Sequence, residues 1–362
     1  MYSLNELGWC EYFSKQLEAN QHDAKQVAAR VAEDNRTIYT IVSAAGEFLS
    51  ELSGKFRHHV LGRADLPVVG DWVIASLRED QRRATIHRVL DRKSRFSRKT
   101  AGRTTEEQIV AANVDVVFLV SSLNREFNAR RIERYLALAW ESGARPVLLL
   151  TKADLCEEPA EAAAGIERVA PAVSVHVVSA LEGRGLGELA AYFEPGQTCV
   201  LLGPSGAGKS TLVNRLLGEE RQEVREIRSY DNRGRHTTTS RQLVFLPDGG
   251  MLIDTPGMRE LQLWGADEAL GQTFGDVEEA AKRCRFTDCG HHPGTPGCGI
   301  QAAIDSGALP AERVASWSKL GRERTFLDRR KDQKAQSEYE KKLRPVTLAR
   351  RTVNLGKEWG DL

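Results

Sequence analysis

The spacing of apolar residues changes along the chain and predicts a different architecture in each part. Over residues 1–35, apolar side chains such as Leu4, Leu7 and Phe13 recur at helical spacing, which predicts an appended helical segment. From residue 37 the residues alternate in short runs separated by turn signals, and these runs predict strands at 37–43, 47–52, 68–76 and 84–89. Short strands at this spacing favour a small β-barrel of the OB type.

After residue 106 the apolar runs become nearly continuous, which is typical of strands buried on both faces. Residues 114–120 and 146–150 are such runs, and between them an amphipathic helix over 129–141 carries Glu133 on its predicted outer face. Strand, helix and strand in this order predict a parallel sheet with helices on both faces. Ligands of such sheets bind beyond the carboxyl ends of the strands, so the residues that follow each strand are the candidates for chemistry.

A complete phosphate-loop pattern follows the apolar run 198–202. It consists of Gly203, Pro204, Ser205, Gly206, Ala207, Gly208, Lys209, Ser210 and Thr211, and a helical stretch that ends at Gly218 follows it. Such a loop before a helix presents backbone N–H groups and a partial positive charge to phosphates. Lys209 is expected to reach the outer phosphates and Ser210 to ligate magnesium. The alternative is a glycine-rich turn with an incidental lysine.

Two strand ends resemble the base-binding elements of GTPases. Thr151, Lys152 and Asp154 have the form of an Asn-Lys-x-Asp element, with threonine in place of asparagine. The Asp154 carboxylate is expected to accept from N1–H and the exocyclic amine of guanine, a donor pair that adenine lacks, while the Lys152 stem packs over the base. Ser179 and Ala180 follow the next predicted strand, at 173–178, and match the loop whose backbone supports the base. The expected nucleotide is therefore GTP.

Residues that would respond to the γ-phosphate follow the phosphate loop. A polar loop over 221–241 contains three threonines, one of which is expected to bind magnesium through its hydroxyl; Thr238 is the candidate, with Thr237 and Thr239 as alternatives. Asp254 ends an apolar strand, as expected of a magnesium-linked carboxylate, and Gly257 can offer its N–H to the γ-phosphate.

The residue after Gly257 is Met258, whose thioether cannot orient an attacking water as the glutamine of Ras-like enzymes does. Slow intrinsic hydrolysis is therefore expected. His236 is the candidate for orienting the water once its loop is ordered, and Arg235 is an alternative group that would stabilise charge on the phosphoryl group. The remaining alternative is that both side chains contact only solvent.

Length and composition indicate a soluble protein of more than one domain. With 362 residues, of which 41% are hydrophobic and 28% charged, the chain is expected to form two or three soluble domains. No apolar run approaches the ~20 residues that span a bilayer, and the first residues do not resemble a secretory signal. A cytoplasmic protein without a membrane partner is therefore expected.

The net charge of +1 conceals an uneven distribution. Residues 82–103 contain nine basic residues, among them Arg92, Lys93, Arg95 and Arg98, against one acid, and Phe96 lies among them. This pattern predicts contacts to RNA phosphates with one stacked base, and the alternative is a solvated barrel face. Residues 319–351 carry twelve basic and five acidic residues and predict a second surface for RNA, with a solvated helix as the alternative.

The GTPase elements occur in the order base specificity, base support, phosphate loop, switch one and switch two, which is a circular permutation of the usual order. On these motifs the chain resembles the circularly permuted GTPases of ribosome assembly. The resemblance implies a monomer that hydrolyses GTP while docking on the small ribosomal subunit and its rRNA during late maturation. Two other hypotheses remain: an ATP-using P-loop enzyme, and a nucleotide-gated RNA-binding module in which hydrolysis is incidental.

A cluster of cysteines and histidines follows the predicted GTPase domain. Three thiolates and one imidazole would form a closed, structural zinc site. The resemblance to a C-x4-C-x-H pattern followed by a further cysteine assigns the ligands as Cys284, Cys289, His291 and Cys298, with His292 as a competitor for the imidazole position. The expected organisation is a helical extension (1–35), an OB-like RNA-binding barrel (36–105), a permuted GTPase domain (106–268), and a zinc-binding domain with a basic helical tail (269–362).

Overall fold

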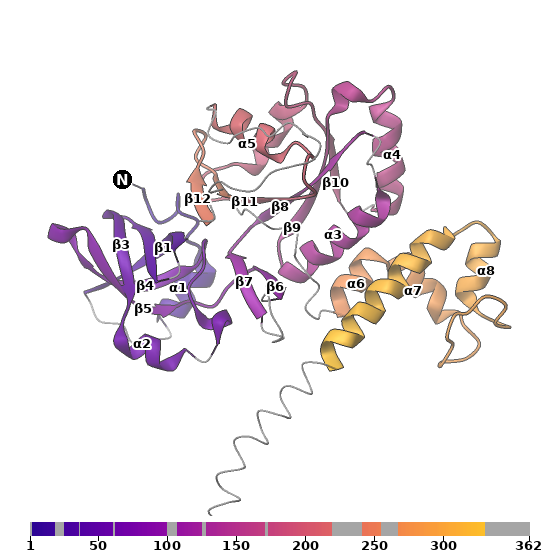
Figure 1. Ribbon diagram of the computed structural model, residues 1–362, viewed down its shortest axis with the longest axis horizontal. Coiled ribbons are helices and arrows are strands. Elements are labelled where there is room, and N and C mark those ends of the chain that lie inside the picture. Colours follow the sequence, from indigo (N-terminus) through magenta and orange to yellow (C-terminus); the bar gives the residue numbers. More distant parts are fainter. Residues whose placement is uncertain are drawn as a thin grey trace, which may run out of the picture.

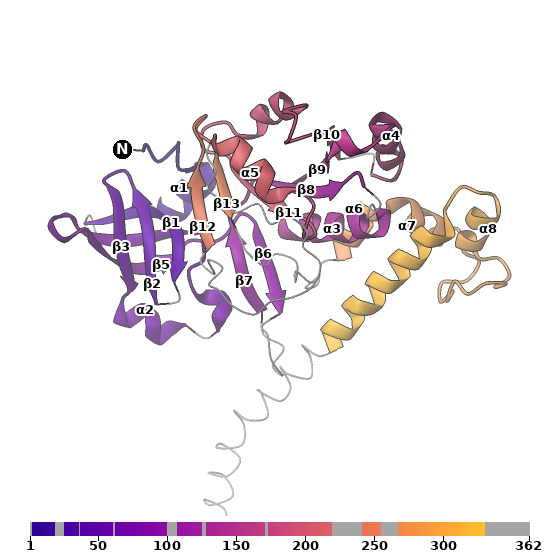
Figure 2. The same ribbon diagram turned by 45° about the horizontal axis from the view of Figure 1, so that its top comes forward.

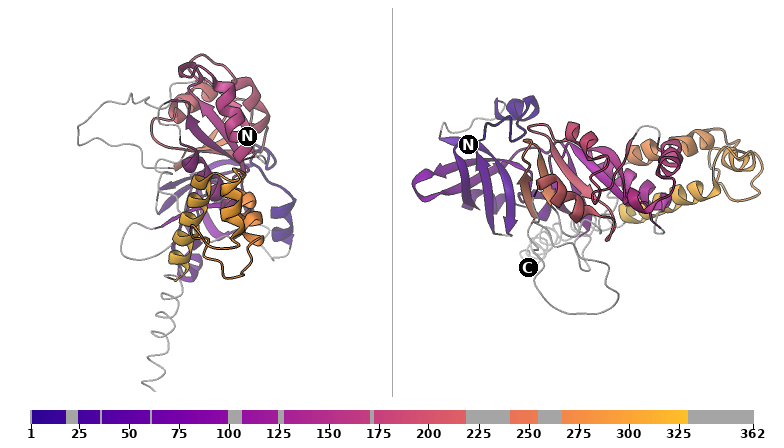
Figure 3. Two further views of the ribbon diagram at one scale, coloured as in Figure 1. Left: turned by 90° about the vertical axis from the view of Figure 1, so that its right-hand side faces the viewer. Right: turned by 90° about the horizontal axis from the view of Figure 1, so that it is seen from above.

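The protein is described by a computed structural model over residues 2–18, 25–35, 37–60, 62–99, 107–124, 128–170, 173–218, 241–254 and 267–329. Three bodies follow one another along its long axis: a β-barrel, a sheet covered by helices, and a group of helices (Figures 1 and 3). None of the helices formed by these residues combines the length and the apolar character of a membrane span.

Five strands close into the barrel: β1 (Gln26–Asn35), β2 (Ile38–Ser43), β3 (Gly46–Leu52), β4 (Trp72–Arg78) and β5 (Arg83–Val89). Their order is β1, β2, β3, β5 and β4, and β4 pairs back onto β1, which completes the ring and confirms the predicted barrel. The interior contains Val31, Tyr39, Ile41 and Phe48. Helix α2 (Gly54–His59) begins at Ser53, whose side chain accepts from the Phe56 N–H.

The amino-terminal segment packs against the barrel. Its helix α1 (Glu11–Glu18) buries Phe13, whose ring centroid lies 5.8 Å from that of Trp72 in β4. The expectation of a helical extension over 1–35 is wrong from Gln26 onward, because residues 26–35 form β1. Three alanines give this segment a helical propensity, but β1 is paired with β2 on one side and β4 on the other, and this tertiary pairing outweighs a weak local preference.

A two-stranded sheet of β6 (Arg95–Lys99) and β7 (Glu107–Ala112) follows the barrel. The central sheet comes next, with β8 (Val116–Ser122), β9 (Arg145–Thr151), β10 (Ser174–Val177), β11 (Thr198–Leu202), β12 (Arg241–Phe245) and β13 (Met251–Asp254). These strands lie in the order β10, β9, β8, β11, β13 and β12, and all neighbours are parallel except β12 and β13. The predicted parallel sheet is thus confirmed.

Three helices accompany the central sheet: α3 (Ala129–Ser142), α4 (Pro159–Val169) and α5 (Lys209–Leu217). Helix α3 begins at Asn128, whose side chain accepts from the Arg131 N–H, and it ends at Gly143, which has a φ of +83°. Because a left-handed backbone favours glycine, Gly143 stops the helix and turns the chain into β9.

The barrel and the central sheet are continuous. Strand β1 pairs antiparallel with β12, so one sheet of eleven strands runs through both bodies. Figure 2 shows β12 and β13 lying between the barrel strands and the remainder of the central sheet.

The last body consists of α6 (Asp267–Thr273), α7 (Gly275–Lys282), α8 (Gly299–Asp305) and a helix over residues 311–329. It is joined to α3 by Arg313, which donates to Glu133 Oε1 over 2.8 Å and to both oxygens of Asp276. The expectation that Glu133 faces outward is therefore wrong. Helical periodicity marks a polar face, but it does not show that a cation of a later helix will cover that face.

Candidate nucleotide site and cysteine cluster

The phosphate loop lies between a strand and a helix, as its motif requires. Strand β11 is buried at all five positions, and α5 begins at Lys209. At Gly203 a Cβ atom would lie 2.3 Å from the Val120 carbonyl oxygen, so a side chain cannot fit there. Gly206 and Gly208 have φ values of +75° and +87°, a backbone region that glycine adopts without strain. The loop conformation is thus fixed by the glycines of the motif.

The polar side chains of the loop gather at the start of α5. The Lys209 ammonium donates to the carbonyl oxygens of Gly203 and Pro204 over 2.8 and 2.7 Å, which folds its stem across the loop. Ser210 and Thr211 are half-buried in the first turn. The positive end of the helix dipole and an ammonium group therefore meet at one place, which is suited to binding phosphate.

The predicted base-binding residues come together at the ends of β9 and β10. Asp154 lies in a short turn after Lys152, which has a φ of +57°. The buried Ser179 hydroxyl donates to Asp154 Oδ1 over 2.5 Å, and Ala180 follows it in the chain. The sequence identified the Ser179 loop only as a backbone support. Its side chain also orients the carboxylate of Asp154.

Thr151 connects the base-binding element to the phosphate loop. Its hydroxyl donates to the Ala207 carbonyl oxygen over 2.6 Å. Thr151 is buried, and a Cβ atom at Gly208 would lie 3.8 Å from its hydroxyl oxygen. The threonine at the position of the usual asparagine therefore provides a direct contact with the loop.

The remaining predicted nucleotide contacts are placed only in part. Asp254 is the last residue of β13, one position beyond Ile253, which pairs with Val200 of β11. Its backbone therefore lies beside the strand that leads into the phosphate loop. Gly257, Thr238 and His236 lie outside the described residues, as do Arg235 and Met258.

Two residues of the basic stretch 82–103, which is predicted to contact RNA and is called the RNA footprint, have structural roles instead. Arg92 donates to both oxygens of Asp71 and to the carbonyl oxygens of Ala64 and Leu66, and the Asp71 side chain is fully buried. Burial raises the pKa of Asp71, and the hydrogen bonds and positive charge of Arg92 oppose that rise. Phe96 is only 2% exposed and cannot stack on a base. These two expectations are wrong because the sequence does not show which side chains of this stretch turn inward: Arg92 lies in the connection between β5 and β6, and Phe96 lies in β6.

Arg95 and Lys93 of the same run are exposed. Arg95 is 58% exposed and lies 3.9 Å from Glu107, while Lys93 pairs with Asp115. Both side chains border a cavity of about 750 Å³, and the walls of this cavity come from the barrel, α3 and α6. The basic run therefore contains one buried structural arginine and several residues that solvent can reach.

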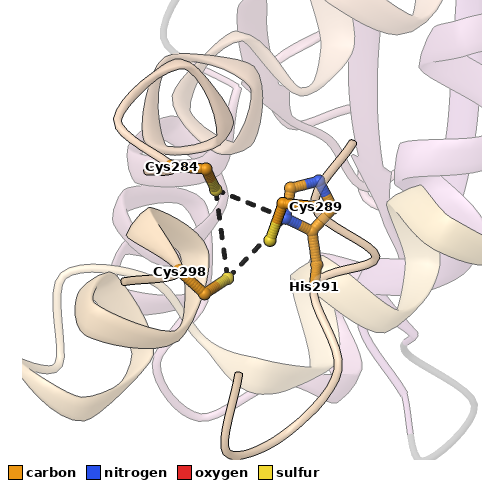
Figure 4. Close-up of side chains that lie close together, drawn as sticks. All are labelled: Cys284, Cys289, His291 and Cys298. Carbon is orange, nitrogen blue, oxygen red and sulfur yellow. Dashed lines mark hydrogen bonds between the residues drawn. The ribbon is translucent and has the colours of Figure 1, made fainter. Parts of the chain in front are cut away.

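The predicted metal ligands converge in the last body (Figure 4). Cys284, Cys289, His291 and Cys298 offer ligand atoms that all lie within 4.8 Å of one another. Cys284 Sγ lies 3.5 Å from His291 Nδ1 and 4.0 Å from Cys298 Sγ. Three sulfurs and one imidazole nitrogen at these separations suit tetrahedral zinc coordination.

The backbone around the cluster selects the imidazole and supports the sulfurs. His291 has a φ of +53°, which turns its ring toward the cysteines, whereas His292 lies against Gly290. The Gly299 N–H donates to Cys284 Sγ over 3.3 Å, and the Gln301 N–H donates to Cys298 Sγ over 3.4 Å. Amide donors of this kind stabilise thiolates. The distance of 3.5 Å between His291 Nδ1 and Cys284 Sγ favours His291 over His292 as the imidazole ligand.

Comparison with known proteins agrees with this geometry. The family model described as RsgA GTPase matches residues 89–264. A protein of Opitutus terrae named small ribosomal subunit biogenesis GTPase RsgA is 44% identical over 339 residues, which cover 91% of this chain and 92% of that protein. A protein of Streptomyces coelicolor with the same name is 48% identical over 275 residues, which cover 75% of this chain and 74% of that protein.

Solved structures show the same fold. The crystal structure of YjeQ from Thermotoga maritima has a TM-score of 0.62 and 27% sequence identity, and the match covers 83% of this chain and 99% of that one. The crystal structure of YloQ, described as a circularly permuted GTPase, has a TM-score of 0.59 and 20% identity, with 87% and 99% coverage.

Proposed function

This chain belongs to the RsgA GTPase family, and we propose that it hydrolyses GTP to GDP and phosphate while bound to the small ribosomal subunit during late maturation of that subunit. The observation that carries the nucleotide part is the Thr151–Ala207 hydrogen bond, because it joins the guanine element to the phosphate loop in one site. ATP use and incidental hydrolysis are the competing functions.

In the proposed site, each group has a separate task. Asp154, oriented by Ser179, accepts from guanine, and the Lys152 stem covers the base. The loop amides of residues 203–208, with Lys209, hold the phosphates. A lysine that now donates to two carbonyl oxygens would exchange them for phosphate oxygens without losing hydrogen bonds.

Two metals belong to the proposal. Ser210 and Asp254, together with Thr238, would hold magnesium, which supplies charge neutralisation between the outer phosphates when bound. A donor set of three cysteines and one histidine fits structural zinc and leaves no position for a substrate. Zinc would therefore hold the helical body together and take no part in hydrolysis.

Hydrolysis itself would depend on residues of the switch segments. We assign orientation of the attacking water to His236, since Met258 cannot perform this task. The neutral imidazole would accept a hydrogen bond from the water once the small subunit is bound, which gives activation by the ribosomal partner.

The RNA-binding part of the proposal rests on the barrel and on exposed basic residues such as Arg83 and Arg95, which are 59% and 58% exposed. We further propose that the chain acts in the cytoplasm as a monomer, with a barrel, a GTPase domain and a zinc-bearing helical domain as its modules.

Measuring turnover of GTP and ATP by the protein alone, with small subunits and with large subunits tests the proposal. A strong increase only with GTP and small subunits is expected. In Asp154→Asn the preference for guanine should fall by about tenfold or more, because an acceptor facing the exocyclic amine becomes a donor. Equal use of both nucleotides would favour the ATP-using enzyme, and turnover unaffected by subunits would favour incidental hydrolysis.

A further inference from the structure

The joint between the barrel and the central sheet lies close to the nucleotide site. Strand β1 pairs with β12 through two positions in register, Glu33 with Gln242 and Asp34 with Arg241. Strand β12 has only five residues, and its other edge pairs with β13. The barrel therefore supplies one of the two hydrogen-bonded neighbours of β12.

Three residues form a line across this joint. Gln242 pairs with Glu33 on one side and with Asp254 on the other. The Gln242 side-chain amide also donates to Glu33 Oε1 over 3.0 Å, and Glu33 Oε2 lies 3.4 Å from the Thr40 hydroxyl of β2. A barrel residue and the strand end that carries Asp254 are thus separated by a single strand.

The amino-terminal segment contacts both strands of this joint, β1 and β12. The ring of Tyr2 stacks on that of Phe245 in β12, with centroids 4.4 Å apart and planes inclined by 16°. Arg30 of β1 is buried, donates to the carbonyl oxygens of Leu7, Gly70 and Asn113, and lies 3.8 Å from the sulfur of Met251 in β13. A displacement of β1 cannot leave β12 and β13 unaffected without breaking these contacts.

We propose that Glu33 and Gln242 are positioning residues, through which the barrel sets the place of the β13 end that carries Asp254. This inference rests on the proposed magnesium role of Asp254. The short strand β12 is hydrogen-bonded along both edges and therefore has less conformational freedom than a strand bonded along one edge. Its pairing with the barrel thus keeps the end of β13 in register beside the phosphate loop. The GTPase site is then complete only when the barrel is correctly docked.

The test measures the affinity of full-length protein for a fluorescent GDP analogue as magnesium chloride is increased. Gln242→Ala removes the side-chain amide without adding a charge opposite Asp254 and should raise the magnesium concentration for half-maximal tightening by about threefold. Glu33→Ala should raise it by about threefold, the effect of one exposed hydrogen bond. The double variant Glu33→Ala with Gln242→Ala should raise the midpoint no further than either single variant, because both substitutions remove the same hydrogen bond.

Glu51→Ala is the matched control, since Glu51 is a barrel carboxylate paired with Arg57 and Arg83, away from β12. It should leave the magnesium midpoint unchanged. Unchanged midpoints in Gln242→Ala and Glu33→Ala, or additive shifts in the double variant, would overturn the inference. Asp254→Asn separates this failure from failure of the proposed function: if Asp254→Asn also leaves the magnesium dependence intact, the magnesium assignment itself is wrong.

Discussion

The hydroxyl of Thr151 donates to the carbonyl oxygen of Ala207 over 2.6 Å, and this bond ties the end of β9 to the phosphate loop. Thr151→Val keeps the shape of the side chain but leaves a buried carbonyl oxygen without this donor. Affinity for GDP should fall by about tenfold, which corresponds to ~1.4 kcal/mol. Titration with a fluorescent GDP analogue measures the loss. Thr151→Ser retains a hydroxyl and should bind nearly as the parent does; equal weakening in both variants would contradict the role of the bond.

Arg92 should contribute to the stability of the folded protein and not to RNA binding. Arg92→Ala leaves the buried Asp71 carboxylate without its cation and is expected to cost about 3–5 kcal/mol of unfolding free energy. A carboxyl group whose pKa is raised by folding destabilises the fold as pH rises from its unfolded pKa to its folded one. The loss should therefore be smaller near about pH 5 than near about pH 7, because Asp71 can take up a proton.

Urea unfolding at the two pH values measures the effect of Arg92→Ala. The matched control is Arg95→Ala, which removes an exposed arginine of the same run and should change stability by less than ~1 kcal/mol. A stable Arg92→Ala protein with weakened RNA binding would restore Arg92 to the RNA footprint.

The buried pair of Arg313 and Glu133 should hold the helical body on α3. Both side chains are 6% exposed. Arg313→Ala therefore leaves a buried carboxylate, and the expected loss is about 3–5 kcal/mol, with faster proteolysis between α6 and residue 329. Arg134→Ala, which breaks the more exposed pair with Glu323, should cost less than ~1 kcal/mol. Similar proteolysis of the two variants would show that burial of the Arg313 pair is unimportant.

The cysteine cluster should bind zinc and stabilise only its own body. Cys289→Ser, or treatment with a chelator, should remove the metal and unfold the helices after about residue 270 while affinity for GDP persists. Elemental analysis, circular dichroism and nucleotide titration provide the three readouts. Cys156→Ser, which changes a half-buried cysteine outside the cluster, serves as the control. Absence of zinc from the purified parent protein would refute the assignment.

His236 should matter only for turnover stimulated by the small subunit. His236→Ala is expected to retain GDP affinity and basal hydrolysis but to lose most of the stimulation, because the variant cannot orient the water. Steady-state phosphate release with and without subunits measures this. Arg235→Ala is the neighbouring comparison and should retain stimulation. Full stimulation of His236→Ala would remove the histidine from the mechanism.

Features whose chemistry is local can be predicted from the amino-acid sequence alone. The glycines at 203, 206 and 208 are required by the backbone path of the phosphate loop. The continuous apolar runs indicate strands that are buried on both faces, as in a parallel sheet. Three cysteines and a histidine within fifteen residues fold into one cluster, because a short chain brings them together. The order of the motifs along the chain is also a property of the sequence, so the circular permutation and the resemblance to circularly permuted GTPases can be recognised without a structure.

The partner of each polar or strand-forming residue depends, in contrast, on tertiary contacts. Residues 26–35 form β1 because two barrel strands pair with them, although their alanines favour helix. Arg92 and Glu133 are charged residues that would ordinarily face water. The Arg92 side chain is only 12% exposed and pairs with Asp71, 21 positions away, while the buried Glu133 pairs with Arg313, 180 positions away. The joint of Glu33 with Gln242 spans 209 positions. Contacts at such separations leave no periodic signal, since they depend on how whole elements pack and not on the spacing of neighbours along the chain.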